Sequence, residues 1–66
     1  MKVKEILTAL TKYYSVTFMN DDTTYEDQTV VSERHREQEV LHCDFEPDDG
    51  DGEKLIIYSY DISYDV

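Results

Sequence analysis

Cysteine, tryptophan and basic residues are scarce in this sequence of 66 residues. Its single cysteine, Cys43, excludes an internal disulfide and is consistent with a reducing cytosol. A zinc site usually takes about four ligands at recognisable spacing, and the soft or borderline ligands of this chain are His35, His42 and Cys43 alone. We therefore expect neither a metal centre nor a cofactor.

The sequence also lacks a long apolar run. None of its hydrophobic segments approaches the roughly 20 residues of a membrane-spanning helix. Lys2 and Lys4 precede an apolar helical face, but no small-residue cleavage site of a signal peptide follows them. We expect a cytoplasmic protein without membrane contact.

Positive charge is scarce, with six Lys and Arg against sixteen Asp and Glu and a formal net charge of −10. Phosphate backbones are bound largely through Lys and Arg, so direct nucleic-acid binding is not expected. The self-repulsion of so many acids opposes compaction, and an acidic surface suits a basic protein partner. The alternative is that the charge serves solubility only.

The short length limits the chemistry. Sixty-six residues form one domain, 1–66, with no room for a deep catalytic cleft. Carboxylates abound, but no two of them are marked as an acid and a base, and no nucleophile is paired with a base. We expect no enzymatic activity.

The C-terminal run from Lys54 to Val66 has the clearest pattern. Large residues alternate with short polar ones, which predicts a strand over about 54–65 with one face in the core and one in solvent. The predicted core face carries Ile56, Tyr58, Tyr60, Ile62 and Tyr64, and the predicted polar face carries Ser59, Asp61, Ser63 and Asp65.

Periodicity also predicts the elements that precede this strand. Val3, Ile6 and Leu7 recur at helical spacing, which predicts an amphipathic helix over about 3–13. Period-two alternation, as in Leu41, Cys43 and Phe45, predicts the remaining strands. These strands cover about 14–19, 28–33 and 39–45.

Residues 32–39 are interpreted as strand ends and a turn, with a short helix N-capped by Ser32 as the alternative. The order of one helix and four strands then predicts an α+β fold in two layers. In this fold one N-terminal amphipathic helix packs on a 3-4-stranded antiparallel sheet.

Residues 48–53 are rich in aspartate and glycine. Pro47 and the two glycines predict a tight hairpin connection. A calcium site is the alternative, because hard cations are bound by several carboxylate oxygens within a short loop. An EF-hand loop that began at Asp49 would need Gly at its sixth position, where this sequence has Lys54. We therefore favour a solvated loop.

Acidic residues after position 20 form the candidate partner-binding set. Residues two apart on one strand face are separated by about 6.6 Å, which is close to the rise of about 6.8 Å over two nucleotides of one DNA strand. Carboxylates on a rigid sheet can therefore take the place of phosphates. The set comprises Asp21, Asp22, Asp44, Glu46, Asp48, Asp49, Asp51, Asp61 and Asp65.

A Lys-rich start, Met1-Lys2-Val3-Lys4-Glu5-Ile6-Leu7, precedes a strongly acidic remainder. In this combination and in its length the chain resembles small phage-encoded inhibitors of the DNA-mimic type, such as anti-CRISPR proteins, anti-restriction proteins and uracil-DNA glycosylase inhibitors. The resemblance implies a protein of the host cytosol. It also implies that the protein blocks a host nuclease or DNA-repair enzyme by occupying its basic DNA channel.

Together these patterns predict a non-catalytic inhibitor that places an acidic surface in the nucleic-acid groove of a basic host protein. The alternative is a small interaction or homodimerisation module that joins exposed strand edges or apolar sheet surface. In that alternative the negative charge serves solubility only.

Overall fold

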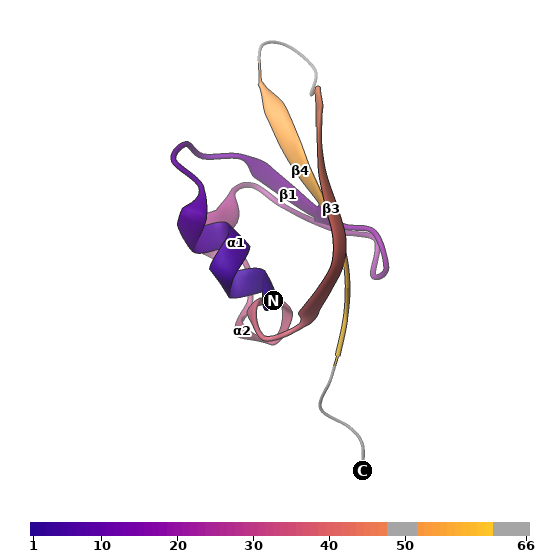
Figure 1. Ribbon diagram of the computed structural model, residues 1–66. Helices are drawn as coiled ribbons and strands as arrows, with labels where there is room; N and C mark the ends of the chain where they lie inside the picture. Colours follow the sequence, from indigo (N-terminus) through magenta and orange to yellow (C-terminus); the bar gives the residue numbers. More distant parts are fainter. Residues whose placement is uncertain (48–51, 62–66) are drawn as a thin grey trace.

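The computed structural model describes residues 1–47 and 52–61. The residues named above that lie outside these ranges are Asp48, Asp49, Asp51, Ile62, Ser63, Tyr64, Asp65 and Val66. Within the described ranges, α1 and α2 lie on one side of a four-stranded sheet (Figure 1). This arrangement confirms the predicted α+β fold with an N-terminal helix packed on a sheet.

The helical segments of this fold are short. The helical segments are α1 (Val3–Ala9), the 3-10 helix η1 (Gln28–Val30) and α2 (Glu33–Arg36). The strands are β1 (Ser15–Phe18), β2 (Thr23–Tyr25), β3 (Glu39–Pro47) and β4 (Glu53–Tyr60). α1 ends before position 13 because Leu10 already has extended backbone angles. Neither α-helix in the described ranges has the length and apolar character of a transmembrane segment.

The strands lie in the order β2-β1-β4-β3. β2 pairs antiparallel with β1, and β3 pairs antiparallel with β4, whereas β1 and β4 run parallel. The prediction of an antiparallel sheet is therefore wrong in this detail, and the sheet is mixed. The reason is the long connection through η1 and α2, after which β3 forms one edge and β4 enters between β1 and β3.

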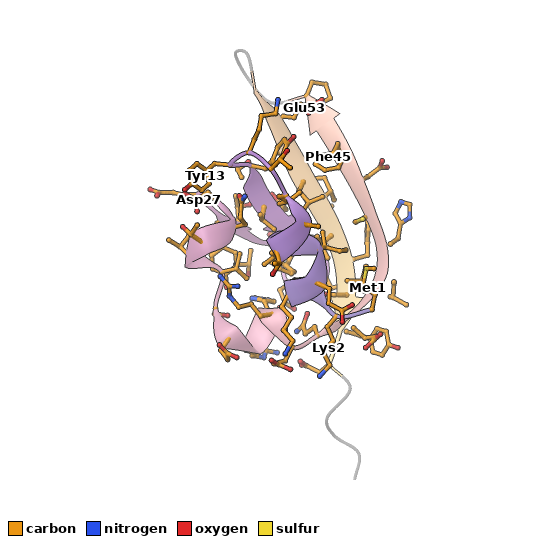
Figure 2. The ribbon with its side chains drawn as sticks, turned by 60° about the vertical axis from the view of Figure 1, so that its left-hand side comes forward. Met1, Lys2, Tyr13, Asp27, Phe45 and Glu53 are labelled. Carbon is orange, nitrogen blue, oxygen red and sulfur yellow. The ribbon has the colours of Figure 1, made fainter. Side chains whose placement is uncertain are left out.

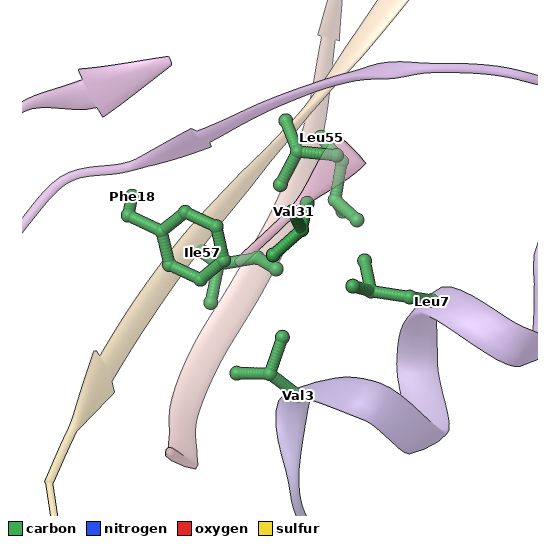
Figure 3. Packing of buried hydrophobic residues seen from close by; sticks show 7 residues of the cluster. Val3, Leu7, Phe18, Val31, Leu55 and Ile57 are labelled. Atoms are coloured by element: carbon green, nitrogen blue, oxygen red, sulfur yellow. The ribbon is translucent and has the colours of Figure 1, made fainter. Parts of the chain in front are cut away.

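The core lies between α1 and the sheet (Figure 3). Val3 and Leu7 are four residues apart on α1 and therefore point to the same side of the helix. They pack in one cluster with Leu55 and Ile57 of the central strand β4. The other buried members of this cluster are Val16, Phe18 and Val31.

The face of β4 that packs in the core is opposite to the predicted one. Leu55, Ile57 and Ser59 face the helices, whereas Tyr58 and Tyr60 keep 38% and 43% of their surface exposed. Ile56, also on the predicted core face, is buried as predicted, but it lies outside the core cluster. The pattern failed because every position from Leu55 to Tyr58 is apolar or aromatic, so alternation does not distinguish the two faces there. The core also accepts Ser59, since its hydroxyl donates a hydrogen bond to Gln38 Oε1 at 2.5 Å.

Residues 28–30 and 33–36 are helical, with Val31 and Ser32 extended between them, so the strand predicted over 28–33 and the turn predicted within 32–39 are wrong. Asp27 caps η1 by accepting a hydrogen bond from the Thr29 N–H at 2.7 Å. Ser32 caps α2 by accepting one from the His35 N–H at 3.5 Å, so the alternative short helix is present. These local side-chain bonds to the backbone outweigh the β-propensity of the valines between them.

A bulge in β3 lies between Val40 and His42. Leu41, at this bulge, is 65% exposed, so the period-two alternation that grouped it with Cys43 and Phe45 does not hold at this position. Beyond the bulge, Cys43 pairs with Ile57 on the helical side. β3 therefore presents different residues to each face of the sheet than simple alternation predicts.

We expect Leu55→Ala to lower the free energy of unfolding by about 2–5 kcal/mol, because the substitution leaves a cavity in a fully buried position. Urea denaturation, monitored by circular dichroism, measures the change in the free energy of unfolding. Leu41→Ala removes the same atoms from an exposed side chain and should cost less than about 0.5 kcal/mol. Equal losses in the two variants would contradict the placement of these residues.

Candidate protein-binding surface

Most basic residues are engaged on the helical side of the molecule. Lys2 Nζ and Lys4 Nζ donate hydrogen bonds to the Glu37 carboxylate at 3.0 and 3.1 Å. These bonds lower the pKa of Glu37, and the bond with Glu37 raises the pKa of Lys2. Arg36 Nε donates to the Val31 carbonyl at 2.9 Å. On the helical side, two lysines therefore neutralise Glu37, and Arg36 is held by a backbone carbonyl.

Asp61, one of the predicted partner-binding residues, belongs to this internal network. Gln38 is buried, and its amide donates to Asp61 Oδ1 at 3.0 Å, while Arg34 Nη2 donates to Asp61 Oδ2 at 3.1 Å. The bonds from Gln38 and then Arg34 lower the pKa of Asp61. Together with the Ser59 hydroxyl on Gln38, they tie the end of β4 to α2 and the start of β3.

The sheet face turned away from the helices, hereafter the open face, carries Asp44 and Glu46 on β3 and Lys54 on β4. Asp44 pairs with Ile56 in the β3–β4 register, and Glu46 pairs with Lys54. Both acids are exposed, and no Lys or Arg nitrogen of the described ranges lies within 4.0 Å of either carboxylate. The nearest ionisable contact is His42, whose Nε2 is 3.7 Å from Asp44 Oδ2.

A shallow groove of about 420 Å³ lies on the open face beside these acids. The rings of His42 and Tyr58 form one part of it, with centroids 5.9 Å apart. A groove with apolar walls and carboxylates suits a side chain with an apolar stem and a cationic end, such as Arg or Lys. Its lining residues are Leu41, His42, Asp44, Glu46, Ile56 and Tyr58.

The other predicted acids are not gathered at this place. Asp21 and Asp22 lie in the turn after β1, where Asp22 adopts a positive φ of 55° that aspartate tolerates in turns. Asp21 is engaged internally, because its Oδ2 lies 2.5 Å from His35 Nε2. The structure therefore brings together Asp44 and Glu46. The predicted residues outside the described ranges are Asp48, Asp49, Asp51 and Asp65.

The sequence analysis missed the network around His35. This side chain is 5% exposed and stacks on Phe18, with ring centroids 4.2 Å apart. Its Nδ1 lies 2.7 Å from the Tyr25 hydroxyl, and its Nε2 contacts Asp21. Neither partner was predictable, because the tight turn after β1 and the cap of α2 bring these residues together. The Ser32 cap was the one local signal for this helix.

The His35 network links α2 to the β1–β2 hairpin. A carboxylate, an imidazole and a hydroxyl follow one another, as in the triads of hydrolases. His35 is only 5% exposed, however, its hydroxyl partner is a tyrosine, and the open-face groove lies on the other side of the sheet. The arrangement therefore explains the position of α2 better than it explains chemistry on a substrate.

Metal ligands are not clustered in the described ranges, where no three His, Cys, Asp or Glu side chains form a group. His42 and Cys43 are neighbours on β3 and point to opposite faces of the strand. Cys43 is half-buried on the helical side. The segment considered for calcium, residues 48–53, lies largely outside the described ranges.

Comparison with known proteins does not identify a relative. No protein-family model matches this chain, and neither a curated protein nor a solved structure is detectably similar to it. The function is therefore inferred from the surface of the molecule.

We expect Tyr25→Phe to lower the free energy of unfolding by about 1–2 kcal/mol, because it removes the hydroxyl beside the buried His35 and keeps the ring packed on Phe18. Urea denaturation at neutral pH measures the loss. Tyr13→Phe removes the same hydroxyl from a side chain that is 77% exposed, and it should change stability by less than about 0.5 kcal/mol. A Tyr25→Phe protein as stable as the Tyr13→Phe control would contradict the role of the network.

We also expect Asp61 to stabilise the fold at neutral pH and to lose this contribution in acid. Its pKa in the folded protein is lowered from the ordinary value of 3.8, so the unfolded chain binds the proton more readily. The contribution is therefore complete well above pH 3.8 and disappears as the pH falls through the folded-state pKa.

Urea midpoints measured between about pH 7 and pH 3 test this expectation. Asp61→Asn should show a weaker fall in stability with acid than the wild type. Glu26→Gln, which removes one negative charge outside the network, is the matched control. If Asp61→Asn followed the wild-type curve, Asp61 would not contribute to the acid sensitivity.

Proposed function

We propose that this protein is a non-catalytic inhibitor that binds the basic nucleic-acid groove of a nuclease or another DNA-processing protein. The contact surface is the β3–β4 end of the open face, with Asp44 and Glu46 at its centre. Such a partner shares the cytosol with this protein, where Cys43 stays reduced.

The segregation of charge carries this proposal. Lys2 and Lys4 are bound to Glu37, and Arg34 is bound to Asp61, all at the helical side or at the end of β4. β3 has no Lys or Arg, and its exposed acids have no basic partner in the described ranges. Other exposed acids, such as Glu26 and Glu33, lie elsewhere, so the β3 end is distinguished by two exposed acids on one strand face beside an apolar groove.

The spacing of the acids on β3 suits a groove that receives DNA. Asp44 and Glu46 are two residues apart on one face of a strand, which separates them by about 6.6 Å. Phosphates two nucleotides apart along one DNA strand differ by about the same rise of 6.8 Å. Because β3 is hydrogen-bonded to β4, little entropy is lost when the partner's Arg and Lys side chains bind these carboxylates.

The sequence that follows β3 extends the acidic character. Residues 44–53 contain six acids and no Lys or Arg. Charge of this density accelerates association with a basic partner and makes binding sensitive to salt. Asp48, Asp49 and Asp51 are therefore included in the proposed contact set.

The decisive experiment asks whether DNA and this protein compete for the same sites. The full chain is immobilised, and the fraction of a bacterial lysate that binds DNA-cellulose is passed over it. We expect specific proteins to be retained and to be released by a duplex oligonucleotide or by moderate salt. Asp44→Asn combined with Glu46→Gln should lower their affinity at least about 10-fold, since charged hydrogen bonds contribute about 1.5–3 kcal/mol each.

Glu26→Gln combined with Glu33→Gln is the matched control, because it changes the net charge equally at exposed acids away from the open face. This control should retain wild-type binding. Retention that resists both salt and duplex DNA would refute the proposal, as would equal losses in the two double variants.

Self-association is the second candidate function. Exposed apolar side chains on β3 favour it, since Leu41 is 65% and Phe45 is 47% exposed. Each copy carries a charge of −10, however, and pairing two β3 strands would place the acids of both copies close together. Sedimentation in low and high salt distinguishes this function, because screening would strengthen self-association and weaken binding to a basic partner.

A further inference from the structure

β3 forms one edge of the sheet, and the first residues of the chain already pair with its beginning. The Val40 N–H donates to the Met1 carbonyl at 2.9 Å, and Lys2 forms an antiparallel bridge with Glu39. Figure 2 shows Met1 and Lys2 at one end of β3 and Phe45 farther along the strand. The outer edge of β3 therefore accepts an added backbone segment.

The residues that cover this part of the edge are basic and apolar. The Met1 amino group forms an ion pair with Glu39, and Lys2 Nζ donates to Glu37 at 3.0 Å. Val3, next in the chain, is fully buried in the core. Two cationic groups, the Met1 amino group and Lys2, thus bind acids at the covered end of β3, and the apolar side chain of Val3 packs in the core beside it.

The remainder of β3, His42–Glu46, has no strand paired to its outer edge within residues 1–47 and 52–61, and it offers the same two kinds of contact. Asp44 and Glu46 lie on the open face, and Cys43 and Phe45 lie on the helical face, where the Phe45 ring is 5.1 Å from that of Tyr14. Phe45 is nevertheless 47% exposed, so part of its ring is free to contact an added segment.

We infer that His42–Glu46 is a strand-addition site for an extended segment of the partner in which Arg or Lys alternates with apolar residues. The cationic side chains would meet Asp44 and Glu46 on the open face, and the apolar side chains would meet Cys43 and Phe45 on the other. Backbone hydrogen bonds to the outer edge of β3 would hold the segment in register. This inference rests on the proposed function, since it specifies how the basic partner is bound.

The limits of the site follow from the strand itself. The bulge near Leu41 interrupts regular pairing at one end, and Pro47 has no N–H with which to continue it at the other. The regular part between them spans about 17 Å, enough for a segment of about five residues. Charge complementarity favours a basic segment over a second copy of this chain, whose own β3 is acidic.

A synthetic peptide with the repeat Arg-Val-Arg-Val-Arg-Val-Arg tests the inference by NMR titration of the isotope-labelled full chain. We expect shift changes confined to β3 from Leu41 to Pro47 and to the adjacent residues of β4. A control peptide, Arg-Arg-Val-Val-Val-Arg-Arg, has the same composition but cannot place all Arg on one face. It should bind at least about 10-fold more weakly.

Backbone methylation of the peptide separates strand addition from simple attraction between charges. One variant carries N-methyl groups on the valines and another carries them on the inner arginines. Only one of these two sets of N–H groups can face β3 in a given strand orientation. We expect one methylated peptide to lose binding at least about 10-fold and the other to keep it.

Three outcomes would overturn the inference. The control peptide and both methylated peptides could bind as well as the alternating one. The shift changes could spread over the helical side. Sedimentation could show a dimer, with hydrogen exchange showing that its β3 amides are already protected. If DNA-displaceable partners still depended on Asp44 and Glu46, the proposed function would stand without strand addition. If those partners were insensitive to the acids, the proposed function itself would fail.

Discussion

Burial of Leu55 and Ile57 on the central strand β4 is the interaction on which the other features depend. β4 is hydrogen-bonded to β1 on one side and to β3 on the other, and its buried side chains pack in the same cluster as those of α1. Because side chains alternate along a strand, this packing directs Ile56 and Tyr58 to the opposite face. The open-face groove is therefore a consequence of how the core forms.

Buried polar groups complete a core that is small in a chain of this length. Gln28, His35, Gln38 and Ser59 are all buried, and no buried side-chain nitrogen or oxygen of the described residues lacks a hydrogen-bond partner. His35 joins α2 to the β1–β2 hairpin, while Gln38 joins the start of β3 to the end of β4. Since an unsatisfied buried polar group costs about 1–3 kcal/mol, these networks also select this packing over alternatives.

The distribution of charge separates stability from binding. Lys2 and Lys4 reduce repulsion near the contact of α1 and α2 by pairing with Glu37. Asp44 and Glu46 receive no such compensation in the described ranges and remain exposed on an edge strand. Charged side chains, a bulge and a proline also protect such an edge from unselective pairing. An acidic edge of this kind excludes another acidic strand and favours a basic one, which links the proposed function to the proposed mode of binding.

The amphipathic pattern from Val3 to Leu7, the strand around Val16 and Phe18, and the excess of acid are local properties, and each was predictable from neighbouring residues. The face of β4 that enters the core was not predictable, because Leu55, Ile56 and Ile57 are equally apolar. Which of them is buried in the core depends on packing against α1 and on the hydrogen bond between Gln38 and Ser59. The parallel pairing of β1 with β4 likewise depends on contacts between distant segments. The sequence pattern does not distinguish one acid from another. Asp61 is bound by Arg34 and Gln38, whereas Asp44 faces solvent. The difference arises from contacts between distant segments, which determine which carboxylates lie beside a cationic side chain.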